Sequence, residues 1–552
     1  MLKLLGKIVK YTLWSIAGVF VLIMGTMTYL YRTADMGEPA MDIDTADYAV
    51  ERHGDVLRCG GSTLRRNAEG VWELTTGGDP VVRGAESGAL LRDLMHYQEK
   101  VFIDQIRRIV PSESYLHFLR VLIVIFNRNM ATYIPEEYRC EIAAQARFCT
   151  HEYDAIGTPY ERQINYHAAH DIGHAMQEYM LVGCSSFAAW NAETVDSALL
   201  VGRNFDFWIG DDFARNKLVT FCRPDRGYPF ASIGWAGMSG VLSGMNAEGL
   251  TVTINAAKGP LPTRVATPIS LLARTILQYA ATIDQAYAIA DTMRTFVSES
   301  LLIASARDRR AAIIEKTPRR TALYTPDGDR LRCTNHYQSA AFADDPDNLE
   351  NVAATDSYYR FKRLGELMDS LRPLDPERCA AILRDRRGLG GVNIGLTNEK
   401  SLNQAIAHHA VVFRPEELLM WVSTNPWQAG EMICYDLRRI FADSTADRPD
   451  CSERVIPADE RFLREDYPRI IRYRAGVAIL REAIRTGSAA DETVRELLRD
   501  NPRYFGAWEL CGDYYAARGD EAEARRHWEQ ALQLEIPRTR ERRSIEHKIS
   551  RL

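Results

Sequence analysis

The sequence predicts an α+β protein whose antiparallel strands and helix pairs stack as a layered sandwich. This prediction rests on the strand-like and helical runs that alternate from Cys184 to about residue 437. Two further observations predict what flanks this domain: a long uncharged apolar run lies near the N-terminus, and a helical pattern extends from about residue 460 to the end of the chain. Antiparallel strands with helix pairs between them are typical of layered α+β domains.

The 552 residues allow two to four domains. We expect a cytoplasmic N-terminus (1–11), a transmembrane anchor (12–31), an extracytoplasmic segment that is mainly helical after residue 90 (32–183), a strand-rich domain (184–440) and a helical C-terminal region (460–552). The net charge of −6 gives no basic field for nucleic acid, so no nucleic-acid partner is expected. The ten cysteines include no CxxC pair, which argues against a zinc ribbon or a thioredoxin-like motif, and their spacing assigns no disulfide.

The predicted anchor is Thr12–Tyr31, an uncharged run of about 20 residues, which is long enough to cross a bilayer. Lys3, Lys7 and Lys10 precede it and acidic residues follow Arg32, so the positive-inside rule places the body of the chain outside the cytoplasm. The alternative is a cleaved signal peptide. The run is long for that, and no small-x-small cleavage site directly follows it.

Between the anchor and Cys184 the pattern changes twice. Residues 32–90 are mixed and rich in turns, and the period becomes helical from Leu90 to Phe148. The stretch Tyr115–Ile134 is nearly apolar, but Arg120 and Asn127 within it favour a buried helix over a second membrane span.

Three histidines lie on one face of a predicted helix at His167, His170 and His174, with Asp171 nearby. Metal ligands can be arranged in this way. The motif is not HExxH, however, and packed or hydrogen-bonded histidines are the simpler interpretation. We therefore expect no metal and no cofactor.

The strand-rich region begins at Cys184. Strands are expected at Ala198–Phe207, Lys217–Cys222, Phe230–Trp235, within 241–255 as a hairpin, at 300–306, 311–316 and 321–325, and at 408–413, 418–423 and 431–436. Helices are expected at 268–281, 283–295, 357–371 and 375–385.

Cys184, Arg203 and Asp206 could meet on two adjacent antiparallel strands. A cation next to a thiol favours the thiolate, and a carboxylate can hold a nearby amine or proton. A buried cysteine at the start of a strand is, taken alone, more often plain core.

The C-terminal region matches a tetratricopeptide repeat at Ala507, Trp508, Leu510, Gly512, Tyr515, Gly519, Ala524, Trp528, Ala531 and Pro537. A single repeat cannot bury its own face, so helices at 473–485 and 491–499 are expected to pack beside it. The alternative is a generic helical hairpin. The match also raises the expectation that this region binds a protein partner.

Several short motifs occur in a fixed order: Gly183-Cys184, Gly202-Arg203-Asn204-x-Asp206, Gly244-Met245-Asn246-x-x-Gly249-Leu250 leading to Asn255, Thr334-Asn335-His336, and Ser357-x-x-Arg360. Through them, residues 184 to about 438 resemble the N-terminal nucleophile (Ntn) hydrolases of the acyl-coenzyme A:6-aminopenicillanate acyltransferase group, relatives of choloylglycine hydrolase, penicillin V acylase and acid ceramidase. The resemblance implies a four-layer αββα sandwich. It also implies a precursor (zymogen) that cuts itself between Gly183 and Cys184, so that the new N-terminal cysteine becomes the nucleophile.

The resemblance also implies roles for the other motif residues. Arg203 would stabilise the thiolate, Asp206 would orient the amine or thiol, and Arg360 would support the site by charge. The side-chain amide of Asn335 and the backbone N–H of Asn255 would form the oxyanion hole. The simpler alternatives are a structural ion pair for Arg203 and Asp206, turn or strand-end positions for the asparagines, and a helix cap at Ser357 with an exposed charge at Arg360.

The functional prediction is a membrane-anchored, self-processing N-terminal-cysteine amidohydrolase or acyltransferase that acts on a small-molecule N-acyl amide through a thioester acyl-enzyme. Acyl-coenzyme A is cytosolic, so an extracytoplasmic location favours hydrolysis over transfer. Trp208, Phe213, Trp235 and Tyr337 are candidates for an apolar acyl pocket. The alternatives are an inactive hydrolase fold that binds a partner through its C-terminal repeat and, more weakly, a metalloenzyme using the histidines of 167–174.

Overall fold

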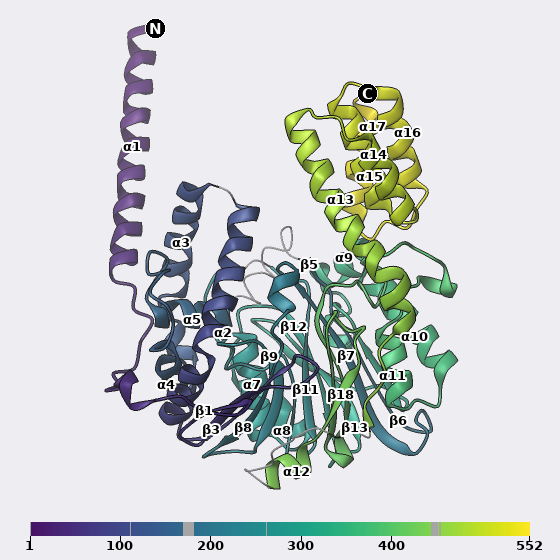
Figure 1. Cartoon of the computed structure of the whole chain (residues 1–552). Coiled ribbons are helices and arrows are strands. Elements are labelled where there is room, and N and C mark those ends of the chain that lie inside the picture. Colours follow the sequence, from purple (N-terminus) through teal and green to yellow (C-terminus); the bar gives the residue numbers. More distant parts are fainter. Residues whose placement is uncertain (1, 111, 169–180, 261, 443–450, 452–453) are drawn as a thin grey trace.

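A computed structural model describes residues 2–110, 112–168, 181–260, 262–442, 451 and 454–552. Two β-sheets lie at its centre (Figure 1). The large sheet has the strand order β1 (Glu51–His53), β2 (Val56–Cys59), β3 (Ser62–Arg66), β4 (Trp72–Gly78), β8 (Leu218–Pro224), β9 (Phe230–Gly234), β10 (Ser243–Asn246), β11 (Leu250–Ala256), β12 (Glu299–Ser305), β13 (Arg310–Lys316) and β14 (Thr321–Tyr324). Neighbouring strands are antiparallel, apart from the parallel pair β4 and β8.

The small sheet has the strand order β15 (Arg330–Cys333), β6 (Ser185–Asn191), β7 (Ser197–Trp208), β16 (Ala407–Arg414), β17 (Leu419–Ser423) and β18 (Met432–Asp436). A further two-residue strand, β5 (Leu181–Val182), pairs with the end of β7. Since β5 comes just before Cys184 and β6 just after it, both sides of the predicted cleavage bond lie along β7.

Alternating side chains divide the core into layers. Along β6, Ala188 packs between the two sheets, whereas Phe187 and Ala189 pack against α10 (Ser357–Leu371) and α11 (Pro376–Leu383). On the large sheet, Ile254 faces the opposite way, toward α7 (Ile269–Tyr279) and α8 (Ile283–Thr292). The order of layers is therefore helices, large sheet, small sheet, helices, and the predicted strand-rich, helix-covered sandwich is confirmed.

The predicted strands and helices of 198–436 are all present within a few residues of their expected bounds. Residues 51–78 differ from expectation. The sequence indicated only a turn-rich stretch, but this segment forms β1–β4 and extends the large sheet. Seven residues of β4, Trp72–Gly78, pair with seven of β8. These strands give a weak sequence signal because they are short, the turns between them contain glycines, and the partner strand β8 lies far along the chain.

The helices before Cys184 pack on this extended sheet. They are α2 (Pro80–Ile109), α3 (Glu113–Asn127), α4 (Glu136–Ala146) and α5 (Pro159–His167). The buried carboxylate of Glu141 on α4 accepts hydrogen bonds from Arg83 on α2 at 2.6 Å and from Arg274 on α7 at 2.7 Å. Although burial acts to raise the pKa of Glu141, the two guanidinium groups outweigh it and lower that pKa to about 2. A buried ionic cluster thus joins the segment before Cys184 to the strand-rich domain.

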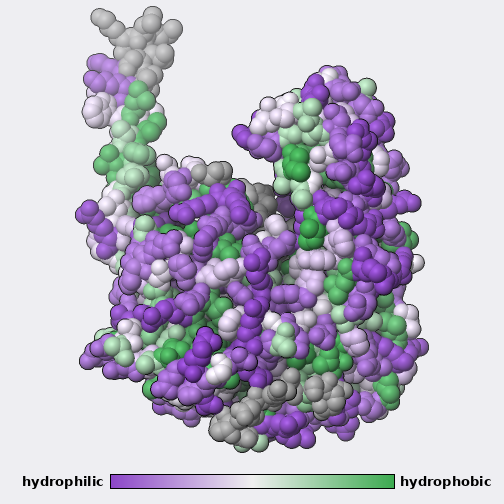
Figure 2. Space-filling view, viewed as in Figure 1, coloured by the Kyte–Doolittle hydropathy of each residue, from purple (hydrophilic) through white to green (hydrophobic). Residues whose placement is uncertain are grey.

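The helix α1 (Leu2–Arg32) projects from the body, and hydrophobic side chains lie along it (Figures 1 and 2). Its stretch Lys10–Arg32 has the length and composition of a membrane span, with a mean hydropathy of 1.8. The expectation of a buried helix at 115–134 is wrong. α3 ends at Asn127, and its Tyr115 and Phe118 are about half exposed, because α3 stands beside α1 and not beneath the body.

The remaining helices are α9 (Pro346–Ala354), α12 (Leu437–Ala442), α13 (Tyr467–Thr486), α14 (Asp491–Asp500), α15 (Phe505–Ala517), α16 (Glu521–Leu532) and α17 (Thr539–Ser550). α15 and α16 approach closely at Gly512, where a Cβ would stand 2.4 Å from the ring of Trp528. α13 and α14 pack beside α15 through Leu480 and Leu497, as expected. Their assignment to the tetratricopeptide class and the domain bounds given above stay predictions.

We expect Glu141→Gln to destabilise the protein by about 3–5 kcal/mol, because two buried guanidinium groups would lose their counter-charge. Thermal unfolding in detergent would measure the loss. Glu492→Gln is the matched control, since Glu492 pairs with Arg495 on the exposed surface and such pairs contribute about 0–1 kcal/mol. Equal melting temperatures for the two variants would contradict the prediction.

Candidate active site

Cys184 lies between β5 and β6 and is fully buried. Its Sγ accepts a hydrogen bond from Nη2 of Arg203 on β7 at 3.7 Å. Burial raises the pKa of the thiol to about 11, and the guanidinium only partly opposes this. In the uncut chain the thiol is therefore neutral at pH 7.

Arg203 is held by neutral acceptors. It donates to the backbone oxygen of Ile254, to Ser243 Oγ and to His409 Nε2. Because these partners carry no charge, they fix the guanidinium beside the sulfur without neutralising it. The preceding Gly202 is required by packing, since a Cβ there would stand 2.4 Å from the ring of Phe187.

Asp206 is fully buried, and among the described residues neither of its carboxylate oxygens has a hydrogen-bond partner. Burial raises the pKa of this carboxyl to about 8, although Arg360 and Arg203 act against the shift. Its backbone oxygen accepts a hydrogen bond from the N–H of Gly183 at 3.1 Å. Asp206, whose backbone holds Gly183 next to the predicted cleavage bond, therefore has a protonated side chain near pH 7.

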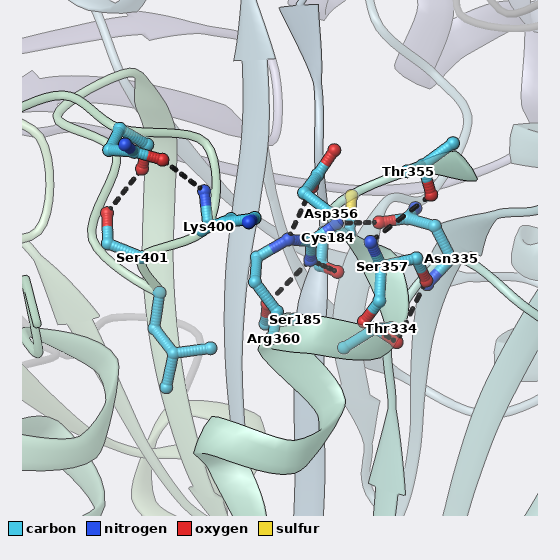
Figure 3. Close-up of polar contacts among 12 residues, drawn as sticks. Cys184, Ser185, Thr334, Asn335, Thr355, Asp356, Ser357, Arg360, Lys400 and Ser401 are labelled. Atoms are coloured by element: carbon cyan, nitrogen blue, oxygen red, sulfur yellow. Dashed lines mark hydrogen bonds and ion pairs between the residues drawn. The ribbon is translucent and has the colours of Figure 1, made fainter. Parts of the chain in front are cut away.

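Arg360 on α10 connects three segments of the site (Figure 3). It donates to the Cys184 backbone oxygen at 2.8 Å, to Asn335 Oδ1 at 2.6 Å and to Asp356 Oδ2 at 2.8 Å. It also donates to Ser185 Oγ at 2.9 Å. Arg360 is buried, so the alternative of an exposed helix charge is wrong.

The two predicted oxyanion-hole asparagines lie at neighbouring strand ends. Asn335 Nδ2 donates to the Ala256 oxygen at 2.7 Å, and Ser357 Oγ accepts the Asn335 N–H at 2.9 Å. The Asn255 side chain accepts from Ser186 Oγ at 2.7 Å and donates to two backbone oxygens, at Cys333 and Thr334. The side chain of Asn255 thus ties β11, β6 and β15 together, and that of Asn335 is already engaged in the uncut chain.

The sequence reasoning missed Ser243 and His409, both of which contact Arg203. Arg203 Nη1 donates to Ser243 Oγ, and the Ser243 hydroxyl lies 2.8 Å from His409 Nε2. Burial lowers the pKa of His409 well below its usual value, so this ring is neutral. A signal was present: two adjacent histidines, His408 and His409, open a strand that is otherwise apolar.

His167 does not fit the metal alternative. Its Nδ1 bonds to the Gln163 oxygen at 2.8 Å and its Nε2 accepts the Ser239 N–H at 2.9 Å, so both ring nitrogens serve the fold. Burial lowers the pKa of His167 to about 4. His170, Asp171 and His174 lie outside the described residues.

A pocket lies beside β7. Its apolar and aromatic lining comes from α2, β7 and the loops after β7 and β9: Met95, Phe102, Phe207, Phe213, Trp235 and Met238. Helices α2 and α5 add polar side chains to the lining: Gln98, Glu99, Gln163, Tyr166 and His167. Two of the four expected acyl-pocket residues, Phe213 and Trp235, are among them. The other two are elsewhere: Trp208 bonds to Asp211, and Tyr337 stacks on Phe342. Phe207 joins the pocket to the site, since it stacks on Phe205, whose ring lies under the Arg203 guanidinium.

Residues 190–425 match the family model of acyl-coenzyme A:6-aminopenicillanic acid acyl-transferase. The predicted resemblance is confirmed. The matched segment begins after Cys184 and contains Arg203, Asp206, Asn335 and Arg360.

An uncharacterized protein of Archaeoglobus fulgidus is 25% identical over 334 residues, which cover 54% of this chain and 55% of that protein. The chain thus spans about half the length of this curated relative. Among solved structures, the Caenorhabditis elegans N-acylethanolamine-hydrolyzing acid amidase ortholog is similar at 17% identity and a TM-score of 0.31, covering 42% of this chain and 93% of that one. A conjugated bile acid hydrolase of Clostridium perfringens (12% identity, TM-score 0.32, 46% and 93% covered) and a penicillin V acylase of Agrobacterium tumefaciens (13%, 0.31, 46% and 87%) are also similar.

The raised pKa of Asp206 makes a pH prediction for the uncut chain. A carboxyl of ordinary pKa near 4 when unfolded and about 8 when folded contributes stability that is fully present below pH 4 and is lost as the pH rises to about 8. In a Cys184→Ala background, Asp206→Asn should therefore gain stability relative to Asp206 by about 1.4 kcal/mol per pH unit over this window. Melting temperatures at pH 5, 7 and 9 would measure it, and a constant difference would contradict the raised pKa.

Proposed function

We propose that this protein is a self-processing amidohydrolase or acyltransferase whose nucleophile is Cys184 after cleavage of the Gly183–Cys184 bond. The observation that supports this most strongly is the convergence on Cys184: a buried guanidinium, Arg203, bonds to its sulfur, and a second, Arg360, bonds to its backbone oxygen and to Asn335. A plain core cysteine needs neither group.

In the proposed reaction, the α-amine freed by cleavage takes the thiol proton, since such an amine has a pKa near 8. The thiolate then attacks the carbonyl carbon of an N-acyl amide. The amide C–N bond breaks, the amine leaves with the proton, and the acyl group remains on Sγ as a thioester. Water or an acceptor amine then takes the acyl group and restores the thiol.

The surroundings of Cys184 give each proposed role a physical basis. The charge of Arg203 stabilises the thiolate because its other partners are neutral. Asp206 has two free carboxylate oxygens among the described contacts and can pair with the new α-amine. Asn335, held by Arg360, and the backbone of Asn255 are the proposed oxyanion donors.

The pocket and the family support a proposal for the substrate class. The pocket beside β7 has both polar and aromatic lining, and the aromatic part, which includes Phe207, Phe213 and Trp235, suits an apolar acyl group. The amidases among the similar structures hydrolyse N-acylethanolamines, conjugated bile acids and penicillin V, as their names state. We propose an N-acyl amide as substrate. α1 is proposed to anchor the protein in the membrane with the catalytic body outside the cytoplasm, and the C-terminal helices are the proposed site for any protein partner.

Self-processing is tested by intact mass and N-terminal sequencing of the full chain. We expect two fragments, one beginning at Cys184, in the wild type and a single uncut chain in Cys184→Ala. Cys379→Ala is the matched control, because Cys379 is a buried core cysteine of α11 with no role in the proposed chemistry. A single chain in all three proteins would favour the alternative of an inactive scaffold.

The proposed extracytoplasmic location can be tested by asking whether Cys434 and Cys451 form a disulfide. The Cys451 N–H donates to the Cys434 oxygen at 2.7 Å, and a hydrogen bond between the two thiols helps to raise the pKa of Cys434. In an oxidising compartment such neighbours are expected to form a disulfide. Alkylation of the unfolded chain from its native membrane should label two fewer of the ten cysteines than alkylation after reduction. Labelling of all ten in both samples would contradict an extracytoplasmic body.

A further inference from the structure

The side-chain amide of Gln404 lies against the residue that precedes Cys184. A Cβ built on Gly183 would stand 2.9 Å from Gln404 Nε2 and 3.6 Å from Arg360 Nη2. A side chain at position 183 would therefore have to displace this amide. Gln404 itself is only 2% exposed.

The amide of Gln404 is uncommitted. Among the described residues, its Nε2 has no hydrogen-bond partner. A buried donor without a partner is unfavourable, because it has lost its contact with water and gained no acceptor. What distinguishes Gln404 is that this donor lies beside Gly183. The other side-chain amides near Cys184 are engaged: Asn335 Nδ2 donates to Ala256 and Asn255 Nδ2 to Cys333 and Thr334.

The loop that carries Gln404 is fixed on both sides. Asn204 on β7 donates to the Leu402 oxygen at 3.0 Å, and Asn403 donates its N–H to the Asp385 oxygen at 2.8 Å. Ala405 has a positive φ of 55°, which is unfavourable for a residue with a side chain. Its oxygen accepts from Arg474 on α13 at 2.7 Å, so the C-terminal helices hold this strained turn. The backbone position of Gln404 is thus set by three separate elements.

We propose that Gln404 is a catalytic residue of self-cleavage, whose side-chain N–H donates to the Gly183 carbonyl oxygen as that oxygen gains negative charge. This inference rests on the proposed self-processing of Gly183–Cys184. Sγ attacks the Gly183 carbonyl carbon, the C–N bond breaks, and the thiol proton passes to the Cys184 nitrogen, which becomes the α-amine. Water then cleaves the thioester, leaving a carboxylic acid on Gly183 and a thiol on Cys184.

The test compares self-cleavage of Gln404→Met with that of the wild type, as full chains purified early and followed over time by intact mass. Removal of one oxyanion donor is expected to slow cleavage by about 10²–10³-fold. The matched control is Gln428→Met. Gln428 is also a buried glutamine, and its amide atoms lack hydrogen-bond partners among the described residues, but it lies in the loop after β17. The control should cleave at the wild-type rate.

Two readouts separate catalysis from a structural role. Because Gln404 Nε2 has no hydrogen-bond partner to lose in the described part of the chain, Gln404→Met should keep the melting temperature of the wild type while losing cleavage. Gln404→Glu keeps the shape but has no N–H; its cleavage should be slow at pH 7 and recover as the pH falls, because a protonated carboxyl donates an O–H. If Gln404→Met does not fold, the pH dependence of Gln404→Glu still tests the role of Gln404.

Hydroxylamine identifies the affected step, because it cleaves thioesters but not amides. In Gln404→Met it should not restore cleavage, since the thioester does not form; restoration would overturn the proposed role. Cleavage of Gln404→Met at the wild-type rate would overturn the inference about Gln404 alone. A wild type that stays uncut would overturn self-processing itself and the role of Gln404 with it.

Discussion

The buried guanidinium of Arg360 is the interaction on which the site depends. It joins the helix α10, the start of β6 and the loop that carries Asn335, and Asp356 compensates its charge at 2.8 Å. If Arg360 were removed, the buried backbone oxygen of Cys184 and the partly buried Oδ1 of Asn335 would both lose this donor. A charge of this kind is tolerated in a core only when its hydrogen bonds are satisfied, so Arg360 fixes the relative position of the elements that it contacts.

The electrostatics of the uncut chain keep the Cys184 thiol neutral. Burial raises the pKa of the Cys184 thiol to about 11 and that of the Asp206 carboxyl to about 8, so near pH 7 both groups are neutral. A new α-amine beside them would change this balance, because an ammonium group favours both the thiolate and the carboxylate. The same burial would then strengthen these ion pairs, since charges interact more strongly away from water.

The segment before Cys184 is part of the architecture and not an appendage. β1–β4 extend the large sheet, and the Arg83–Glu141–Arg274 cluster joins α2 and α4 to α7. If the chain is cut at Gly183–Cys184, we expect these contacts to hold the two pieces together, because they include a parallel strand pair and a buried ionic cluster. α1, which precedes them, would then still be attached to the catalytic part.

The sequence by itself determined the strands and helices of 198–436, the N-terminal apolar helix and the order of the motifs around Cys184, because these depend on local periodicity and on residues close together in the chain. α10, for example, has the expected bounds of 357–371. Only the tertiary structure decided that residues 51–78 join the large sheet, that α3 is exposed, that His409 contacts Arg203, and that Gln404 lies beside Gly183. Arg203 meets His409 across 206 positions and Arg360 meets Cys184 across 176. Contacts over such separations are selected by how the layers pack, which no local pattern records.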